Sequence, residues 1–170
     1  MKNKAVFLDR DGTINIDYGY IHTIDKFEFL PGVPEALYQL QQAGFLLIVV
    51  TNQSGIARGY YSEEEFDLLC QEIDHKLERY KVKINHTYHC PHLEGCTCRK
   101  PQLELFYRAA KDFDIDFSQS YAIGDKERDL SICYAEQVKG FLIGNTEKEC
   151  KPYTCVSSLS EAVARYILSK

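Results

Sequence analysis

The sequence predicts a three-layer α/β fold, in which helices cover both faces of a central parallel sheet. Two observations lead to this prediction. The main apolar runs are continuous rather than alternating, as in strands that are buried on both faces. These runs also alternate along the chain with amphipathic stretches, which is the order of a parallel sheet with right-handed crossovers. A length of 170 residues fits a single domain, which we expect to span residues 1–170.

Strands and helices are predicted in alternation. We expect strands at 6–8, 45–50, 121–123 and 140–143. We expect helices at 34–42, 62–80, 103–113, 127–137 and 158–168. The start of the second helix is marked by Ser62 and Glu65, which have the spacing of a capping box. An apolar stripe from Phe66 to Tyr80 then predicts the face that this helix buries.

Composition excludes several classes of protein. Hydrophobic residues make up 45 % of the chain and the formal net charge is −5, which is typical of a soluble globular protein. No basic surface is evident, so we expect no nucleic-acid partner. The longest apolar run, 45–50, is far shorter than the roughly 20 residues of a membrane span. We see no export signal and expect a cytoplasmic monomer with its cysteines reduced or bound to metal.

Polar residues follow the predicted strands at points that fall on one edge of the sheet. The segment 9–13 follows the first strand and 51–55 the second. The segment 124–126 follows the third, with Asp129 four residues after Asp125, while 99–101 precedes a helix. Ligands of open α/β sheets bind outside the carboxyl ends of the strands. We therefore expect these four segments to form one site.

The residue types at this edge predict phosphoryl transfer. Asp9 and Asp125 would repel each other unless a hard cation lay between them, and Mg²⁺ prefers a few carboxylates together with a substrate phosphate. Such a site allows Asp9 to attack phosphorus. We expect Asp11 to act as the general acid and base, and Thr51 and Lys100 to stabilise the transferring phosphoryl group.

A second cluster combines three cysteines with a histidine. Cys90, His92, Cys96 and Cys98 lie within nine residues, which predicts a closed Cys3His zinc site in a loop at about 88–100. Because all four positions would be filled, the zinc would be structural and would hold the segment that carries the active-site lysine. The remaining cysteines have no such partners and are expected to be reduced thiols; they are Cys70, Cys133, Cys150 and Cys155.

The four segments resemble the motifs of the haloacid dehalogenase (HAD) superfamily of phosphatases. The resemblance rests on the runs 9–13 and 51–52, on Lys100, and on Gly124 with Asp125. It implies a Rossmann-like fold, an aspartyl-phosphate intermediate, and Mg²⁺ held by Asp9, Asp125 and the backbone carbonyl of Asp11. No interval between the motifs is long enough for a large cap domain, so we expect an open site.

Within the superfamily the chain looks like subfamily III, in the zinc-loop branch, which holds heptose 1,7-bisphosphate 7-phosphatases and histidinol-phosphate phosphatases. The runs 17–22 and 51–59 resemble the heptose enzymes, whereas the short zinc loop and the segment 101–105 look more like the histidinol-phosphate enzymes. We favour the heptose bisphosphate, because arginine and lysine are more numerous here than one phosphate requires. A non-catalytic phosphosugar-binding zinc protein is the alternative from another class. The implied substrate contacts are Asp17, Tyr18, Gly19, Tyr20, Thr51, Asn52, Gln53, Ser54, Arg99, Lys100 and Lys126.

Overall fold

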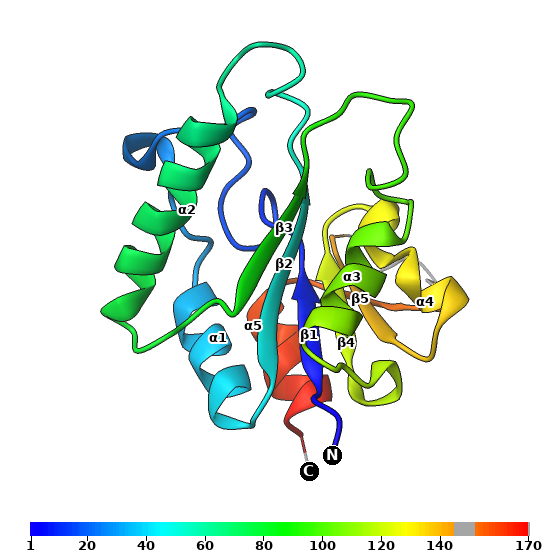
Figure 1. Cartoon of the computed structure of the whole chain (residues 1–170). Helices are drawn as coiled ribbons and strands as arrows, with labels where there is room; N and C mark the ends of the chain where they lie inside the picture. Colours follow the sequence, from blue (N-terminus) through cyan, green and yellow to red (C-terminus); the bar gives the residue numbers. More distant parts are fainter. Residues whose placement is uncertain (145–151, 170) are drawn as a thin grey trace.

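A six-stranded parallel sheet forms the centre of the computed structural model, which describes residues 1–144 and 152–169 (Figure 1). The strands are β1 (Ala5–Leu8), β2 (Leu46–Asn52), β3 (His86–Cys90), β4 (Tyr121–Gly124), β5 (Lys139–Ile143) and β6 (Thr154–Val156). Their order across the sheet is β3-β2-β1-β4-β5-β6, and every neighbouring pair is parallel. All the carboxyl ends therefore lie at one edge.

Helices cover both faces of this sheet, which confirms the three-layer architecture. They are α1 (Val33–Gln42), α2 (Glu63–Glu78), α3 (Glu104–Asp112), α4 (Ile132–Ala135) and α5 (Leu159–Glu161), which continues into a π-helical segment (Ala162–Ile167). Short 3₁₀ turns lie at Ile24–Lys26, Phe117–Gln119 and Glu127–Leu130. Figure 1 shows α1, α2 and α5 on one side of the sheet, and α3 and α4 on the other.

The central strand shows why continuous apolar runs fit this arrangement. Val6 and Leu8 belong to the core cluster under α1, α2 and α5, while Ala5 and Phe7 belong to the cluster under α3 and α4. Successive side chains of a strand point to opposite faces, so a strand covered on both sides needs apolar residues at every position. All four residues are fully buried or nearly so.

Two of the six strands were not predicted from the sequence. β3 reads His-Thr-Tyr-His-Cys and β6 has three residues, so neither forms the continuous apolar run that marks the inner strands. Both are edge strands, where only one side of the strand pairs with a neighbour. Polar side chains are tolerated at such edges, which removes the signal used for the inner strands.

Two helix predictions need correction. The predicted helix at 127–137 is a 3₁₀ turn (Glu127–Leu130) followed by the four-residue α4. The Asp129 carboxylate accepts from the Lys126 N–H at 3.0 Å and so caps the first turn of this segment. The predicted stripe of α2 also ends early, since the helix stops at Glu78 and Tyr80 is 42 % exposed. The capping box of Ser62 and Glu65 is confirmed.

The cysteines outside the predicted zinc loop differ in state. Cys70 and Cys133 are half-buried free thiols. Cys155 is disulfide-bonded, so the expectation of a reduced thiol is wrong for this residue. Cys150 lies outside the described residues.

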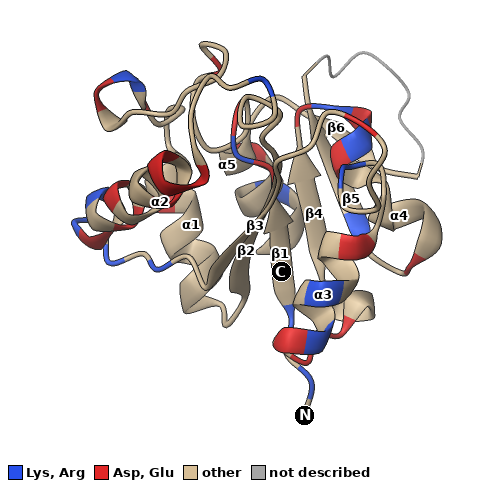
Figure 2. Ribbon diagram, turned by 45° about the horizontal axis from the view of Figure 1, so that its top comes forward, with Lys and Arg blue, Asp and Glu red and all other residues tan. Residues whose placement is uncertain are grey.

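The segments that leave the carboxyl ends of the strands are connected by backbone hydrogen bonds. The Gln53 N–H donates to the carbonyl of Cys90 at 2.8 Å, and the Ala57 N–H donates to that of Pro91 at 3.2 Å. The loop after β2 is thereby joined to the loop after β3. In Figure 2 acidic and basic residues lie close together in these loops. Over 1–144 and 152–169, no helix combines the length and apolar character needed to cross a membrane.

Candidate active site

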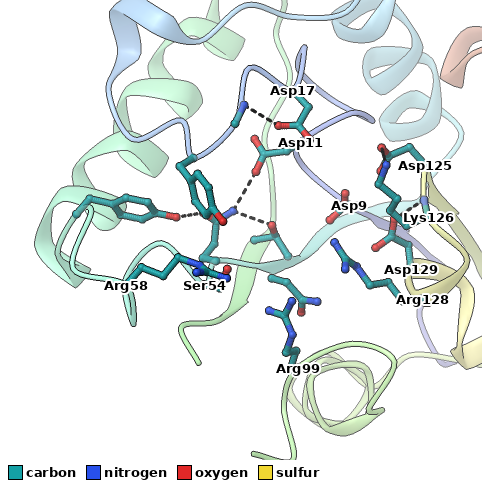
Figure 3. A pocket seen from close by; sticks show the side chains of 16 residues that line it. Asp9, Asp11, Asp17, Ser54, Arg58, Arg99, Asp125, Lys126, Arg128 and Asp129 are labelled. Atoms are coloured by element: carbon teal, nitrogen blue, oxygen red, sulfur yellow. Dashed lines mark hydrogen bonds and ion pairs between the residues drawn. The ribbon is translucent and has the colours of Figure 1, made fainter. Parts of the chain in front are cut away.

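A cavity of about 400 Å³ opens at the carboxyl ends of the strands (Figure 3). Its size falls within the range of sites for small molecules, roughly 300–1,000 Å³. Twelve of the predicted site residues line it: Asp9, Asp11, Asp17, Gly19, Tyr20, Thr51, Asn52, Gln53, Ser54, Arg99, Asp125 and Lys126. Four further residues complete the lining: Arg58, Tyr61, Arg128 and Asp129.

Two predicted residues do not line the cavity. Tyr18 is 60 % exposed, and its hydroxyl donates to Glu28 Oε2 at 2.8 Å, away from the site. Lys100 is 2 % exposed and lies directly beneath the floor, where it contacts Asp9. Tyr18 is therefore placed outside the site, whereas Lys100 reaches it from below.

The buried Lys100 ammonium is held by three oxygen atoms. Its Nζ lies 2.8 Å from Asp9 Oδ1, 2.7 Å from Asp129 Oδ1 and 2.6 Å from the carbonyl oxygen of Val50. Although burial disfavours the charged form, the two carboxylates raise the pKa of Lys100 above its usual value. The ammonium group is thus charged and fully satisfied at neutral pH.

Three carboxylates converge beside this lysine. One oxygen atom each from Asp9, Asp125 and Asp129 lies within 4.8 Å of the others. Burial raises the pKa of Asp9 to about 7, and burial followed by repulsion from Asp129 raises the pKa of Asp125. Oδ1 of Asp125 is buried and has no hydrogen-bond partner among the described residues.

These features fit a hard divalent cation such as Mg²⁺. Lys100 pairs with Asp9 and Asp129, and Lys126 Nζ lies 3.4 Å from Asp125 Oδ2, yet the pKa values of Asp9 and Asp125 stay raised. A divalent cation among the three carboxylates would favour their ionised forms. An unpaired buried carboxylate oxygen is costly unless a cation coordinates it. The side-chain cluster adds Asp129 to the predicted Asp9 and Asp125, whereas Asp11 was expected to contribute its backbone carbonyl and not its side chain.

Gly12 allows the Asp125 carboxylate to approach the loop after β1. Its φ angle of +86° lies in the left-handed region, and a Cβ placed there would lie only 2.3 Å from Asp125 Oδ2. At Gly124 a Cβ would lie 2.3 Å from the Cβ of Asp129. Two glycines thus provide the space in which the carboxylate cluster forms.

The Asp11 carboxylate is oriented by its neighbours rather than by the cation cluster. Nη2 of the buried Arg10 lies 3.0 Å from each oxygen of Asp11. Asn15 Nδ2 donates to Oδ1 at 2.9 Å, and Gln53 Nε2 donates to Oδ2 at 3.3 Å. In Figure 3 the Asp11 carboxylate lies at one side of the cavity, across from the group formed by Asp125 and Asp129.

The residues at the end of β2 fix the position of Lys100. Asn52 Oδ1 accepts from the Lys100 N–H at 2.9 Å, and Asn52 Nδ2 donates to the Lys100 carbonyl at 3.2 Å. This pair of bonds holds the Lys100 backbone against the sheet. Thr51 beside it is 1 % exposed, and its Oγ1 accepts from Gln53 Nε2 at 2.9 Å.

Positively charged side chains line the side of the cavity opposite Asp11 and Asp17. Figure 3 shows Arg99 and Arg128 entering from different segments with their guanidinium groups directed into the cavity, and Arg58 at another edge. Arg128 forms no hydrogen bond or ion pair with any residue in the described part of the chain, and Arg99 donates only to the His92 carbonyl, at 3.4 Å. These cations are available to an anionic ligand.

Two lining residues were not associated with the site from the sequence: Tyr61 and Arg128. Asp129 was expected at this edge because it lies four residues after Asp125. Arg128 and Tyr61 carried no such signal, since a single arginine or tyrosine in a polar loop resembles any exposed residue. Their assignment depends on the three-dimensional structure.

The four residues of the predicted zinc loop do converge. Cys90 Sγ lies 3.0 Å from Cys98 Sγ and 3.6 Å from Cys96 Sγ, and His92 Nδ1 lies 3.3 Å from Cys98 Sγ. Zinc–sulfur bonds of about 2.3 Å would separate tetrahedral ligands by about 3.8 Å, so these atoms surround a volume suited to Zn²⁺. Desolvation raises the pKa of the Cys96 thiol, but backbone N–H groups outweigh it and lower this pKa to about 7, which favours the thiolate.

Replacing Gly12 tests the carboxylate cluster. We expect Gly12→Ala to lower Mg²⁺ affinity at least tenfold, because the new methyl group displaces Asp125, and to lower the free energy of unfolding by about 1–2 kcal/mol. Calorimetric titration with Mg²⁺ and urea denaturation measure the two effects. Gly19→Ala is the matched control, since Gly19 has a φ of +82° but nothing within 4 Å of its Cβ position. Equal Mg²⁺ affinity in the two variants would contradict this account.

Removal of a cysteine ligand tests the zinc loop. We expect Cys98→Ser to lose one bound zinc per chain, to lower Tm by at least about 5 °C, and to reduce activity even in excess Mg²⁺. Elemental analysis and thermal melting check the first two effects. Cys70→Ser, which changes a thiol outside the cluster, should retain the zinc. Full stability and activity in a protein shown to be free of zinc would rule out a structural zinc site.

Comparisons with known proteins agree with this geometry. The family model for haloacid dehalogenase-like hydrolases matches residues 15–133, which is more than half of the chain. A D-glycero-beta-D-manno-heptose-1,7-bisphosphate 7-phosphatase from Haemophilus ducreyi is 51 % identical over 157 residues, covering 87 % of this chain and 86 % of the relative. A D-glycero-alpha-D-manno-heptose-1,7-bisphosphate 7-phosphatase from Campylobacter jejuni is 44 % identical over 149 residues, covering 88 % and 87 %.

A solved structure shares the fold over nearly the whole chain. The D,D-heptose 1,7-bisphosphate phosphatase from B. bronchiseptica, complexed with magnesium and phosphate, superposes with a TM-score of 0.85 at 27 % identity. The match covers 94 % of this chain and 96 % of that one. Together with the family model and the close relatives, it shows that this chain belongs to the haloacid dehalogenase-like hydrolase family.

Proposed function

We propose that this protein is a magnesium-dependent phosphatase that removes the 7-phosphate of D-glycero-D-manno-heptose 1,7-bisphosphate through an aspartyl-phosphate intermediate. The observation that carries the proposal is the arrangement of Asp9 and Asp11 at the cavity, with Lys100 bonded to Asp9 from beneath. The similarity to heptose bisphosphate phosphatases supports the choice of substrate. A phosphoric monoester hydrolase needs a nucleophile, an acid and a stabiliser of phosphoryl charge, and all three have a candidate here.

In the first step Asp9 acts as the nucleophile. Lys100 Nζ is bonded to its Oδ1, while Oδ2 makes no hydrogen bond with a described residue and is available to attack phosphorus. The bond between phosphorus and the sugar oxygen breaks, and the Asp11 carboxyl group supplies the proton with which the sugar oxygen leaves as an alcohol. Thr51 and Lys100 stabilise the negative charge on the transferring group.

In the second step water hydrolyses the aspartyl phosphate. The Asp11 carboxylate takes a proton from the water, whose oxygen attacks phosphorus and releases inorganic phosphate. Asp9 is regenerated as a carboxylate and Asp11 as an acid. The net reaction consumes one phosphate monoester and one water, and produces one alcohol and one phosphate.

The metal site completes this scheme. Asp9, Asp125 and Asp129 would hold Mg²⁺, together with the backbone carbonyl of Asp11. When bound, the ion neutralises the carboxylates and the phosphoryl oxygens, so that one anion can approach another. The chain itself then contributes orientation, because Lys100, Arg10 and Gln53 hold the two reacting carboxyl groups.

The cations of the cavity favour a substrate with a second phosphate. Lys100 and Lys126 already pair with the carboxylates, so the guanidinium groups of Arg58, Arg99 and Arg128 remain for the phosphates of the substrate. Arginine binds phosphate through two parallel hydrogen bonds, which suits it to hold a non-reacting phosphate. Histidinol phosphate, which carries an amine at the other end, would leave these groups without an anion.

The proposal extends to the state of the protein. We propose that it is a single-domain enzyme that works as a monomer. We propose a cytoplasmic location, because the substrate is a charged phosphosugar, with neither nucleic acid nor membrane as a partner. Light scattering of the purified protein measures the oligomeric state, and a stable dimer would correct that part of the proposal.

A substrate comparison tests the activity. With Mg²⁺, we expect release of one phosphate from the α or β anomer of the heptose bisphosphate, and at least a hundredfold lower kcat/KM for histidinol phosphate. Asp9→Asn should retain the fold by circular dichroism and lose all turnover, because an amide is a poor nucleophile. A preference for histidinol phosphate would change the substrate and keep the mechanism. No turnover of any phosphate monoester would favour a non-catalytic phosphosugar-binding protein.

A second test concerns the proposed phosphate contact at Arg128. We expect Arg128→Gln to lower kcat/KM for the bisphosphate about 10- to 100-fold, because a charge-assisted bond to phosphate is lost. The ratio of kcat/KM for the bisphosphate to that for the 7-monophosphate should fall by a similar factor. Arg108→Gln, which changes an arginine on α3 outside the cavity, is the matched control. An unchanged ratio would remove Arg128 from substrate binding.

A further inference from the structure

A short chain of hydrogen bonds lies behind Asp11. The side-chain amide of Gln53, a residue only 3 % exposed, lies between Asp11 and Tyr61. Its Nε2 donates to Thr51 Oγ1 at 2.9 Å and to Asp11 Oδ2 at 3.3 Å, and its Oε1 accepts from the Tyr61 hydroxyl at 2.5 Å. The bond that reaches Asp11 is one of the dashed lines in Figure 3.

The chemistry of these groups determines which way the amide faces. The Asp11 oxygen beside Gln53 can accept a hydrogen bond whether the carboxyl group is ionised or carries a proton, and in the structure the amide nitrogen faces it. The carbonyl oxygen then faces Tyr61, whose hydroxyl has to donate. Without that hydroxyl the buried Oε1 would have no partner among the described residues, which costs free energy and favours rotation of the amide. Rotation would take the donor away from Asp11.

The Tyr61 ring is itself held in one position. It is 4 % exposed and lies parallel to the His22 ring, with 5.1 Å between the ring centroids and 10° between the planes. A Cβ at Gly55 would lie 2.3 Å from a carbon of the Tyr61 ring, so the backbone is packed directly against the ring. Burial raises the pKa of Tyr61 to about 12, so the hydroxyl keeps its proton at neutral pH.

We propose that Tyr61 is a positioning residue which, through Gln53, holds the Asp11 carboxyl group where it can give its proton to the leaving oxygen of the substrate. The inference rests on the proposed phosphatase activity. In the step concerned, the electron pair of the breaking P–O bond goes to the sugar oxygen, which takes the Asp11 proton. Tyr61 acts at a distance from this transfer, because Gln53 lies between it and Asp11.

Leaving-group dependence separates this role from a merely structural one. An alkoxide needs a proton in order to leave, whereas p-nitrophenolate leaves without one. A residue that orients the acid should therefore matter for sugar esters and matter little for aryl esters. A residue that only stabilises the fold should affect both to the same extent.

The test compares Tyr61→Phe with Tyr60→Phe. Tyr60 provides a matched control, because it is 54 % exposed and does not line the cavity. Single-turnover rates of ester cleavage are measured for the heptose bisphosphate, trifluoroethyl phosphate and p-nitrophenyl phosphate. We expect Tyr61→Phe to slow cleavage of the sugar ester about 5- to 10-fold and of the aryl ester less than about twofold. Tyr60→Phe should match the wild type on all three.

Further outcomes distinguish the two proposals. Equal slowing of all esters by a folded Tyr61→Phe protein, or no slowing of any, would overturn the role of Tyr61 and leave the phosphatase proposal intact. Gln53→Met, which removes both the donor and the acceptor, should reproduce the dependence on the leaving group, and its failure to do so would also overturn the role. If the wild-type protein cleaves none of the esters, the proposed function itself fails.

Discussion

Burial of the Lys100 ammonium group is the constraint on which the site depends, because a charged amine removed from water has to find oxygen partners in fixed positions. Removing one partner of a buried ion pair lowers the free energy of unfolding by roughly 3–5 kcal/mol. Here the partners are Asp9 directly after β1, the Val50 carbonyl within β2, and Asp129 in the segment after β4. The lysine therefore links β1, β2 and the segment after β4 at one point, and the order of the strands brings that point to the floor of the cavity.

The rest of the architecture serves to place this lysine. Asn52 bonds to both the N–H and the carbonyl of Lys100, so the end of β2 fixes its backbone. The Cys3His cluster precedes it directly in the chain and closes the loop between β3 and α3. A loop without regular structure would otherwise carry the lysine on a mobile backbone, and a catalytic group needs support from its surroundings to hold its geometry. The zinc loop thus supports the phosphoryl site, because it holds the backbone that carries Lys100.

Much of the site could be predicted from the sequence, because parallel strands end at the same edge and the residues after them must meet. Asp9, Thr51 and Asp125 could be placed together for this reason, and the zinc ligands could be identified from the chemistry of thiolates. Residues whose role depends on distance in space could not be found in this way. Arg128 lies in a segment predicted as a regular helix, and Tyr61 contacts Asp11 only through Gln53. Tyr18 shows the opposite case: its position in a recognisable motif predicted a substrate contact, but its hydroxyl donates to Glu28 and the residue does not line the cavity.

The unpaired Asp125 oxygen links the stability of the fold to cation binding. The fold holds the carboxylates of Asp9, Asp125 and Asp129 close together. Without a cation these carboxylates repel one another in the folded chain, whereas in the unfolded chain they are far apart. A ligand that binds only the native state adds stability that grows with the logarithm of its concentration. Folding and cation binding are therefore linked, and the concentration of free divalent cation sets how much of the repulsion remains. The same carboxylates that make the chemistry possible couple the stability of the fold to the ionic composition of its surroundings.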